Sequence, residues 1–352
     1  YNTYFDDKGI IRTDVVENGS IITITGNITN KDLTFSNIKA FLSSKKNIYI
    51  QNGSISIINN ASLIINNTNI INNNKVGLLI DSDNNLITYN NIMIDSNKPI
   101  EAIIIKKDNN NLEKNVINIT STTNNTGISI ESSYNYLLSN KINTTTISKI
   151  TDTTIIGLNL KSNTNNNILS GNRILMMSNI NAIGEKLIKS DNNIINDNIY
   201  VYASENTKGV ELINSQNNQI NNYINIRSNN TGYGTIITGE KALNKNNTIS
   251  NNIDITADTI IGTLLENTTN TNISSRSTSM NYVTRGNTVR TILTKNTNNT
   301  EIFYLSIHII KEITDKMPDL IGIEQINSEN TNITAIGMQK YISSGSYVNY
   351  NS

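Results

Sequence analysis

Residues 77 to 94 begin with Gly77-Leu78-Leu79-Ile80-Asp81-Ser82-Asp83-Asn84-Asn85-Leu86 and end with Ile92 and Ile94. Apolar residues alternate with period two in two parts of this segment, at Leu78 and Ile80 and again at Ile92 and Ile94, which is the period of a half-buried β-strand. The pattern returns, with substitutions, down most of the chain. Each copy opens with Gly or Ala, at Gly77, Ala102, Gly127, Gly157, Gly184, Gly209, Gly234 and Gly262. The chain is therefore an internal repeat with a period of 25 to 30 residues.

Three further features recur with these openings. An Asn precedes the second apolar step of each copy, at Asn85, Asn111, Asn135, Asn167, Asn193, Asn218, Asn247 and Asn272. The first strand is predicted to point inward with Leu78/Ile80, Ile103/Ile105, Ile128/Ile130 and Leu158/Leu160, then, after a shift of one residue, with Ile188, Ile213, Ile237 and Leu265. The later strand is predicted to point inward with Ile92/Ile94, Ile117/Ile119, Ile142/Thr144, Ile174/Met176, Ile199/Val201, Ile224/Ile226 and Ile253/Ile255.

A repeat of this length, made of short strands and Asn or Gly corners, is typical of one coil of a solenoid. Leucine-rich repeats have a similar length but need a Leu-led pattern, whereas this chain is led by Ile. We predict an all-β fold, a right-handed parallel β-helix of about 25 to 30 residues per coil with irregular capping coils at both ends.

The composition agrees with thin stacked layers. The chain holds 69 Asn and 65 Ile but only 4 Phe and no Trp. Ile suits a pleated strand, and Asn tolerates the left-handed corner conformation and can bond to a copy of itself one layer away. Lys plus Arg and Asp plus Glu are both 28, without a basic stripe, which argues against nucleic acid as a partner. No apolar run is long enough to span a membrane, and the absence of Cys excludes disulfides and thiol catalysis.

We interpret residues 1–352 as a single domain with three parts. Residues 1–75 form an N-terminal cap and first coils of looser register, with strands predicted at 21–25, 47–50, 54–57 and 62–65. Residues 76–286 are the regular coils, and 287–352 are irregular C-terminal coils and a cap. In that last part the alternation of Phe303, Leu305, Ile307 and Ile309 favours a strand, although Leu305, Ile309, Ile313 and Met317 also fit a helical stripe, and residues 322–333 look like one more coil. The start at Tyr1 indicates a mature or excised segment of a longer secreted precursor.

Several segments carry a family resemblance: Tyr4-Phe5-Asp6-Asp7-Lys8-Gly9, Thr25-Gly26-Asn27-Ile28-Thr29-Asn30-Lys31, the stretch 59–68 and the Ser-x-x-Asn-x-Ile coils. Together they resemble the adhesin-like surface proteins of methanogenic archaea, within the pectin-lyase-like right-handed parallel β-helix superfamily. The resemblance covers residues 1 to 286. It implies a secreted, cell-wall-associated protein that contacts other cells or polymers, and it supplies no catalytic motif for positions in this chain.

Enzymes of that superfamily that cleave polysaccharide need several carboxylates and a basic residue on one face. The nearest candidates here are Asp81, Asp83 and Asp108 with Lys106, Lys107 and Glu131. Four residues after successive openings, however, the chain reads Asp81, Lys106, Glu131 and Lys161, a ladder of alternating sign that stacking alone would select. Calcium would need six or more oxygen ligands, of which Asp81 and Asp83 are only a start.

The other titratable residues do not suggest chemistry either. We interpret His308 as an ordinary strand residue, and Asp152, Asp191, Asp197 and Asp254 as solvated corners. We therefore predict no catalytic residue, no metal and no cofactor.

The outward positions of the later strand contain one departure from a polar pattern. Two adjacent coils place Leu175, Met177, Tyr200 and Tyr202 outward, with Arg227 at the border. A contiguous apolar and aromatic patch usually marks a contact, and Tyr can stack on sugars or on another protein. The alternative is that extra residues at about Thr145 to Thr154 cover it, and the sequence favours neither reading.

The leading functional hypothesis is a non-enzymatic, extracellular, adhesin-like surface protein that presents a β-helix face to a cell-surface protein or polysaccharide. A polysaccharide lyase or glycoside hydrolase on the same scaffold is the first alternative. A structural spacer or self-associating assembly subunit of a surface layer or filament is the second.

Overall fold

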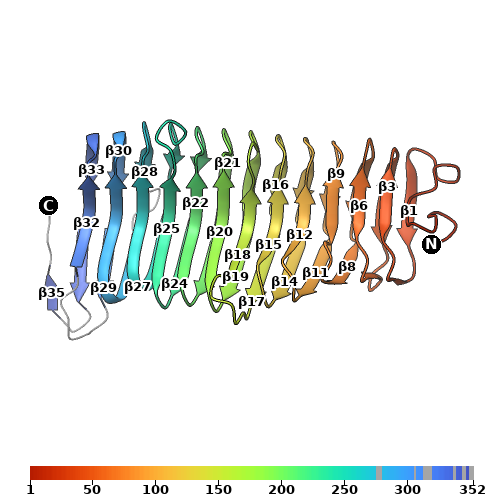
Figure 1. The fold of residues 1–352 in the computed structure, drawn as a ribbon, viewed down its shortest axis with the longest axis horizontal. Helices are drawn as coiled ribbons and strands as arrows, with labels where there is room; N and C mark the ends of the chain where they lie inside the picture. Colours follow the sequence, from red (N-terminus) through yellow and green to blue (C-terminus); the bar gives the residue numbers. More distant parts are fainter. Residues whose placement is uncertain (275–279, 305–306, 312–318, 336–337, 343–345, 349–352) are drawn as a thin grey trace. The chain divides into compact units, whose positions relative to one another are not determined.

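The computed structural model describes residues 1–274, 280–304, 307–311, 319–335, 338–342 and 346–348. The chain divides into two compact units, Tyr1–Leu175 and Met176–Ser352. In both, the described residues form strands and no helix, and nearly all strand pairs are parallel (Figure 1). Each unit is a parallel β-solenoid, and the two together hold about 11 turns. This confirms the predicted all-β class and is consistent with a right-handed parallel β-helix.

The strands that begin in the first unit are β1 (Ser20–Ile24), β2 (Ile28–Thr29), β3 (Leu33–Ser36), β4 (Lys39–Ser44), β5 (Tyr49–Gln51), β6 (Ile55–Ile58), β7 (Ser62–Asn66), β8 (Asn69–Asn73), β9 (Leu78–Asp81), β10 (Leu86–Thr88), β11 (Asn91–Ser96), β12 (Ile100–Ile105), β13 (Asn111–Glu113), β14 (Val116–Ser121), β15 (Asn125–Ile130), β16 (Tyr136–Leu138), β17 (Lys141–Thr146), β18 (Thr154–Leu160) and β19 (Ile168–Ser178).

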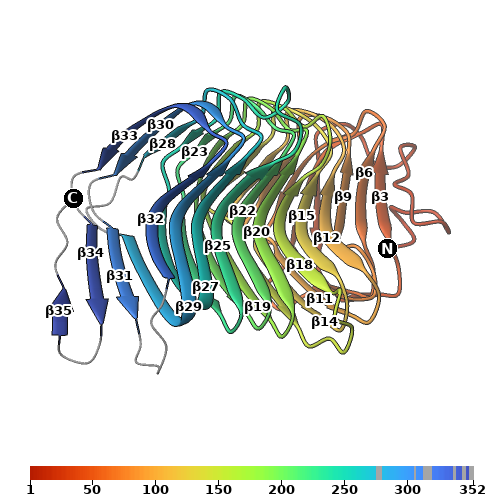
Figure 2. The same cartoon turned by 60° about the vertical axis from the view of Figure 1, so that its left-hand side comes forward.

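The strands of the second unit are β20 (Asn181–Ile188), β21 (Ile194–Ala203), β22 (Asn206–Ile213), β23 (Gln219–Ile220), β24 (Tyr223–Ser228), β25 (Thr231–Thr238), β26 (Thr248–Ile249), β27 (Asn252–Glu266), β28 (Asn272–Ser274), β29 (Met280–Lys295), β30 (Asn298–Tyr304), β31 (Ile307–Lys311), β32 (Asp319–Ile326), β33 (Glu329–Ala335), β34 (Met338–Ile342) and β35 (Ser346–Val348). Figure 2 shows β20, β22, β25, β27, β29 and β32 side by side.

The first coils are shorter than the later ones but equally regular. Leu33 pairs with Ile55 and Ile55 with Leu78, so these coils contain 22 and 23 residues. Leu78, Ile103 and Ile128 then follow at steps of 25. All four strands predicted in residues 1–75 are present within one or two residues, but β2, β3, β4 and β8 were not predicted. Residues 1–75 were predicted to have a looser register because their corners contain fewer residues than those of the later coils.

The parallel stack also continues beyond residue 286. β29 pairs in parallel with β27, β31 and β32, and β30 pairs with β33. The strand reading of Ile307 and Ile309 is confirmed, since both lie buried on β31, whereas Leu305, Ile313 and Met317 lie outside the described residues. The antiparallel pair of β34 with β35 follows at the C-terminal end.

Most predicted inward residues are buried, but the shift of one residue in the second unit is wrong. Leu187, Leu212, Ile237 and Leu265 share one register position and are buried. Ile188 and Ile213 stand beside them, half-buried and outward. The cause of the error is Glu185, which follows Gly184 as Ile128 follows Gly127 and occupies an inward position. Because Glu185 is charged, the sequence pattern assigned it to an outward position and moved the predicted inward residues by one.

The repeated opening glycines leave room for the Ile of the later strand. A Cβ at Gly127 would lie 2.4 Å from Cγ2 of Ile142 and 2.6 Å from the carbonyl oxygen of Gly157. Gly184 and Gly209 have the same relation to Ile199 and Ile224. The small residue and the branched residue therefore fill one layer of the core together.

Asparagines form two buried ladders inside the first unit. Their members are Asn85, Asn110, Asn135 and Asn167 in one ladder, and Asn90, Asn115, Asn140 and Asn172 in the other. Each Oδ1 accepts the backbone N–H of the ladder residue one coil earlier, at 2.8 to 3.0 Å. The Asn predicted before the second apolar step of each copy is wrong at two positions. Asn111 aligns with outward Leu86, so Asn110 takes the inward ladder position there. Asn272 aligns with outward Thr248, so Thr271 takes the inward position in that coil.

Candidate functional site

One outward face of the second unit is rich in tyrosine. It is built by β21, β24 and β27, whose inward residues Ile199, Ile224 and Ile253 fix the side on which their neighbours project. Tyr200 pairs with Asn225, which pairs with Asp254, and Tyr202 pairs with Arg227. We call Tyr200, Tyr202, Tyr223, Asn225, Arg227 and Asp254 the tyrosine face.

Tyr223 belongs to this face although the sequence analysis missed it. Its ring centroid lies 5.8 Å from that of Tyr200, with the planes tilted by 58°. Its hydroxyl donates to Oδ2 of Asp254 at 3.1 Å, and Asn281 Nδ2 donates to the other oxygen of Asp254 at 3.0 Å. Only the positions between and after the inward residues were considered, whereas Tyr223 stands one residue before Ile224. The period of two would have found it, since it lies two residues before Asn225.

Tyr202 is held by a cation. Cζ of Arg227 lies 5.7 Å from the centroid of the Tyr202 ring, within the distance of a cation–π contact. Both rings of β21 are half-buried, and Arg227 is exposed. A ring whose orientation is already restrained loses less entropy when a ligand stacks on it.

The surroundings of Tyr223 keep its phenol protonated, so that it can donate a hydrogen bond. Burial raises the pKa of Tyr223, and the carboxylate of Asp254 raises it further, while the hydrogen bond from Asn225 opposes them. The phenol is therefore protonated at neutral pH. The face offers aromatic surface, one amide, one guanidinium and one carboxylate, which is the mixture of apolar area and placed polar groups that fixes a small polar ligand.

Three of the five predicted site residues lie on the tyrosine face. Tyr200, Tyr202 and Arg227 share the tyrosine face, and Met177 of the same unit is 50% exposed. Leu175 ends the first unit, where it is half-buried. The predicted insertion is the turn between β17 and β18, also in the first unit, and it exposes Ile147 and Ile150.

The candidate acidic cluster has a structural role. The residues of the predicted charge ladder, Asp81, Lys106, Glu131 and Lys161, lie at equivalent positions of successive coils. Lys161 Nζ forms ion pairs with Glu131 at 2.8 Å and with Glu101 at 2.7 Å. Asp83 and Asp108 each accept a backbone N–H from the following coil, at 2.9 and 2.8 Å. Within the part of the chain that the structure describes, no group of three or more His, Cys, Asp or Glu could hold a metal ion.

The solvated-corner reading of Asp197 is wrong. Asp197 is 1% exposed and takes the ladder place beside Asn222, whose Oδ1 accepts its backbone N–H at 2.7 Å. Asn222 Nδ2 donates to the fully buried carboxyl of Glu185, also at 2.7 Å. Burial raises the pKa of Glu185 well above its ordinary value, and the neighbouring Asp197 raises it further.

The other three aspartates differ from Asp197. Asp152 is exposed, as predicted. Asp191 is half-buried and accepts two bonds from Gln216, and Asp254 is half-buried in the tyrosine face. His308 lies half-buried on β31, in accord with its reading as a strand residue.

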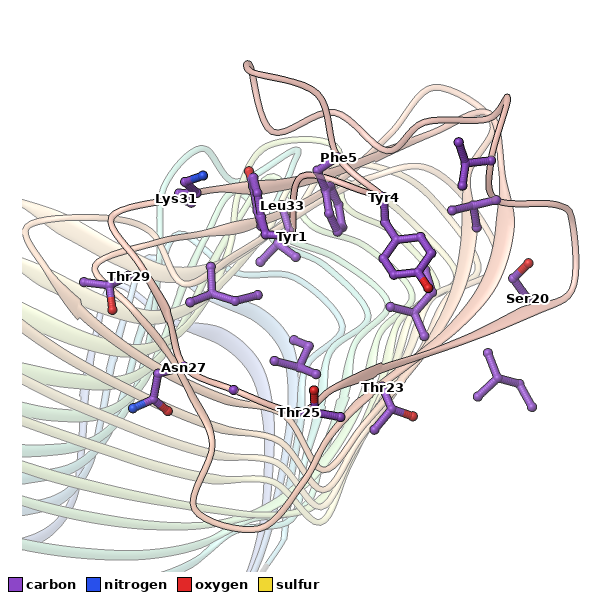
Figure 3. A pocket seen from close by; sticks show the side chains of 17 residues that line it. Tyr1, Tyr4, Phe5, Ser20, Thr23, Thr25, Asn27, Thr29, Lys31 and Leu33 are labelled. Carbon is purple, nitrogen blue, oxygen red and sulfur yellow. The ribbon is translucent and has the colours of Figure 1, made fainter.

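A cavity of about 560 Å³ opens at the first coil (Figure 3). Tyr1 and Phe5 stack beside it at 5.1 Å, and Lys31 Nζ lies 4.4 Å from the Tyr1 ring. Its floor includes the inward residues Ile22, Ile24 and Ile28 of β1 and β2. The cavity is thus the open end of the apolar core of the first unit, partly covered by residues 1–16.

No protein-family model matches the chain, and no curated protein does so either. Among the residues with described positions, no helix is long and apolar enough to cross a membrane.

Proposed function

We propose that this chain is a non-enzymatic surface protein that contacts polysaccharide through the tyrosine face. The observation that carries the proposal is the convergence of three tyrosines on one outward face, with Arg227 against Tyr202 and Asp254 bonded to Tyr223. In earlier coils the same outward position holds Ile71, Met93, Asn118 and Asn143, none of which offers a ring. A sheet with fixed rings suits the apolar face of a sugar, and the amide of Asn225 and the carboxylate of Asp254 suit its hydroxyls.

An extracellular, adhesin-like role and a polymeric sugar as partner belong to the same proposal. They are supported by the resemblance of residues 1 to 286 to adhesin-like surface proteins of methanogenic archaea and by the repeated, charge-balanced faces of the solenoid. A protein partner would use the same rings, so the ligand class is decided by binding measurements on defined glycans.

Replacing both Tyr200 and Tyr202 with Ser is expected to weaken polysaccharide binding by about 10- to 100-fold, because each lost ring removes about 0.7 to 1.4 kcal/mol of stacking. Replacing both with Phe keeps the rings and is expected to change binding by less than about threefold. Affinity electrophoresis in gels containing soluble polysaccharides measures both.

Tyr233→Ser is the matched control, since Tyr233 lies outward on β25 of the same unit and outside the tyrosine face. Equal binding by the Ser double variant and the wild-type chain would rule out the tyrosine face as the contact.

A further inference from the structure

A polar cleft in the first unit carries two tyrosines that the tyrosine face does not use. Its volume is about 370 Å³, within the roughly 300 to 1,000 Å³ of small-molecule sites. Its lining, which we call the corner cleft, consists of Ser44, Lys46, Asn47, Tyr49, Asn67, Asn69 and Tyr89. The cleft therefore draws on three successive coils.

The register explains how these residues meet. Asn47, Asn67 and Tyr89 are corner residues with φ of 62°, 52° and 56°. Tyr49 and Asn69 begin β5 and β8 and pair with each other. One corner column and one outward column thus form the two sides of the cleft. Ser44 Oγ donates to the carbonyl oxygen of Asn67 at 2.9 Å and so joins two successive coils at this corner.

Tyr89 is an unusual residue for its backbone. Positive φ in this chain is mostly taken by Asn, at φ between 49° and 66°, because a bulky side chain is strained there. Tyr89 adopts this strained conformation although 54% of its surface is exposed. Lys114 Nζ donates to its hydroxyl at 3.0 Å and lies 5.3 Å from its ring, which restrains it. Strain of this kind, held in place by neighbours, is concentrated at binding sites.

The charge of the cleft selects the ligand. None of its seven lining residues carries a carboxylate, whereas Lys46 lies in it and Lys114 stands beside Tyr89. The nearby carboxylate of Glu113 accepts a bond from Asn111 at 2.6 Å. Among the described residues, the ammonium of Lys46, the amides of Asn47 and Asn67 and the hydroxyl of Tyr49 have no side-chain partner. Donors and positive charge beside two rings match an anionic group on a sugar.

We propose that the corner cleft binds a sugar that carries a carboxylate or a sulfate. The ring of Tyr89 stacks on the sugar, Lys46 pairs with the anionic group, and the corner amides bind hydroxyls. This site lies in the other unit from the tyrosine face and does not rest on it.

The test is isothermal titration of the whole chain with three oligosaccharides of equal length: one containing glucuronic acid, one sulfated galactan and one neutral galactan. The wild-type chain is expected to bind at least one anionic probe about tenfold more tightly than the neutral one. Tyr89→Asn and Lys46→Gln are each expected to weaken that binding about tenfold. The arm that binds shows whether carboxylate or sulfate is the recognised group.

Tyr89→Asn installs the residue that the corner prefers, so its thermal midpoint is expected to equal or exceed that of the wild type, which separates lost binding from lost folding. The Tyr200→Ser, Tyr202→Ser double variant is expected to keep the anionic binding. Equal binding of neutral and anionic probes, unchanged binding by Tyr89→Asn, or loss only in the double variant would each overturn the corner cleft as an anionic-sugar site. The last outcome would still leave the tyrosine face in place.

Discussion

Replacing Asn115 with Ala is expected to lower the free energy of unfolding by about 3 kcal/mol. The side chain makes four buried hydrogen bonds: Oδ1 accepts from the backbone and the amide of Asn90, and Nδ2 donates to Ile87 O and to Asn140 Oδ1. The substitution leaves the buried N–H of Asn90 without its acceptor and opens a small void. An unpaired buried donor alone costs about 1 to 3 kcal/mol. Urea unfolding monitored by circular dichroism measures the change.

The matched control is Asn118→Ala, three residues along the same coil. Asn118 points outward and accepts a single bond, from Asn143 Nδ2 at 2.8 Å. Its replacement is expected to cost less than about 1 kcal/mol. If both variants lost equal stability, the inward ladder would not hold the coils together as described.

Replacing Glu185 with Gln is expected to stabilise the second unit at pH 7 by about 2 kcal/mol and to flatten its dependence on pH. The carboxyl of Glu185 is fully buried, accepts from Asn222 and faces Asp197, so its pKa in the fold is raised well above the ordinary value of 4.5. A neutral amide keeps the bond from Asn222 and adds a donor toward Asp197. Thermal melts between pH 4 and pH 9 measure the effect.

The sign of the pH dependence follows from proton binding. Below pH 4.5 both the folded and the unfolded chain hold the Glu185 proton, and the contribution of this group to stability is complete. As the pH rises, the unfolded chain ionises first, so this contribution is lost progressively through the folded-state pKa. We therefore expect the wild-type second unit to lose stability from acid toward neutral pH and the Gln variant to lose much less.

Glu211→Gln, on the neighbouring strand β22, is the control in which loss of the charge is expected to destabilise the fold. Glu211 points outward and pairs with Lys186 and Lys208. Because the Glu211 side chain is only 8% exposed, its neutralisation is expected to destabilise by about 2 kcal/mol at pH 7. A Glu185→Gln variant that melts lower than the wild type at pH 7, with an unchanged pH slope, would refute the account of the buried acid.

Most of the fold can be predicted from the repeat period of the sequence. The spacing of Gly127 from Gly157 and the alternation of Ile92 with Ile94 gave the solenoid, because a coil must return its inward residues to the same layer. The exceptions are places where a polar residue faces inward. Glu185 displaced the predicted register, and Asp197 was read as a corner although it replaces an Asn inside a ladder.

The candidate site was predicted in part for a similar reason. Alternation alone placed Tyr200, Tyr202, Arg227 and Asp254 outward, and the structure adds Tyr223 and the hydrogen bond that joins it to Asp254. The corner cleft could not be predicted, because it depends on which residues of three coils share a corner. The backbone strain at Tyr89 is likewise invisible until φ is known.

The central claim is that this chain binds polysaccharide without cleaving it, and a glycan array paired with a reducing-sugar release assay tests it most directly. The wild-type chain is expected to bind at least one neutral polysaccharide, to release no reducing ends from it, and to bind it about 10- to 100-fold more weakly when Tyr200 and Tyr202 are both Ser. Release of reducing ends by the wild-type chain, or the absence of binding to every glycan, would contradict the claim.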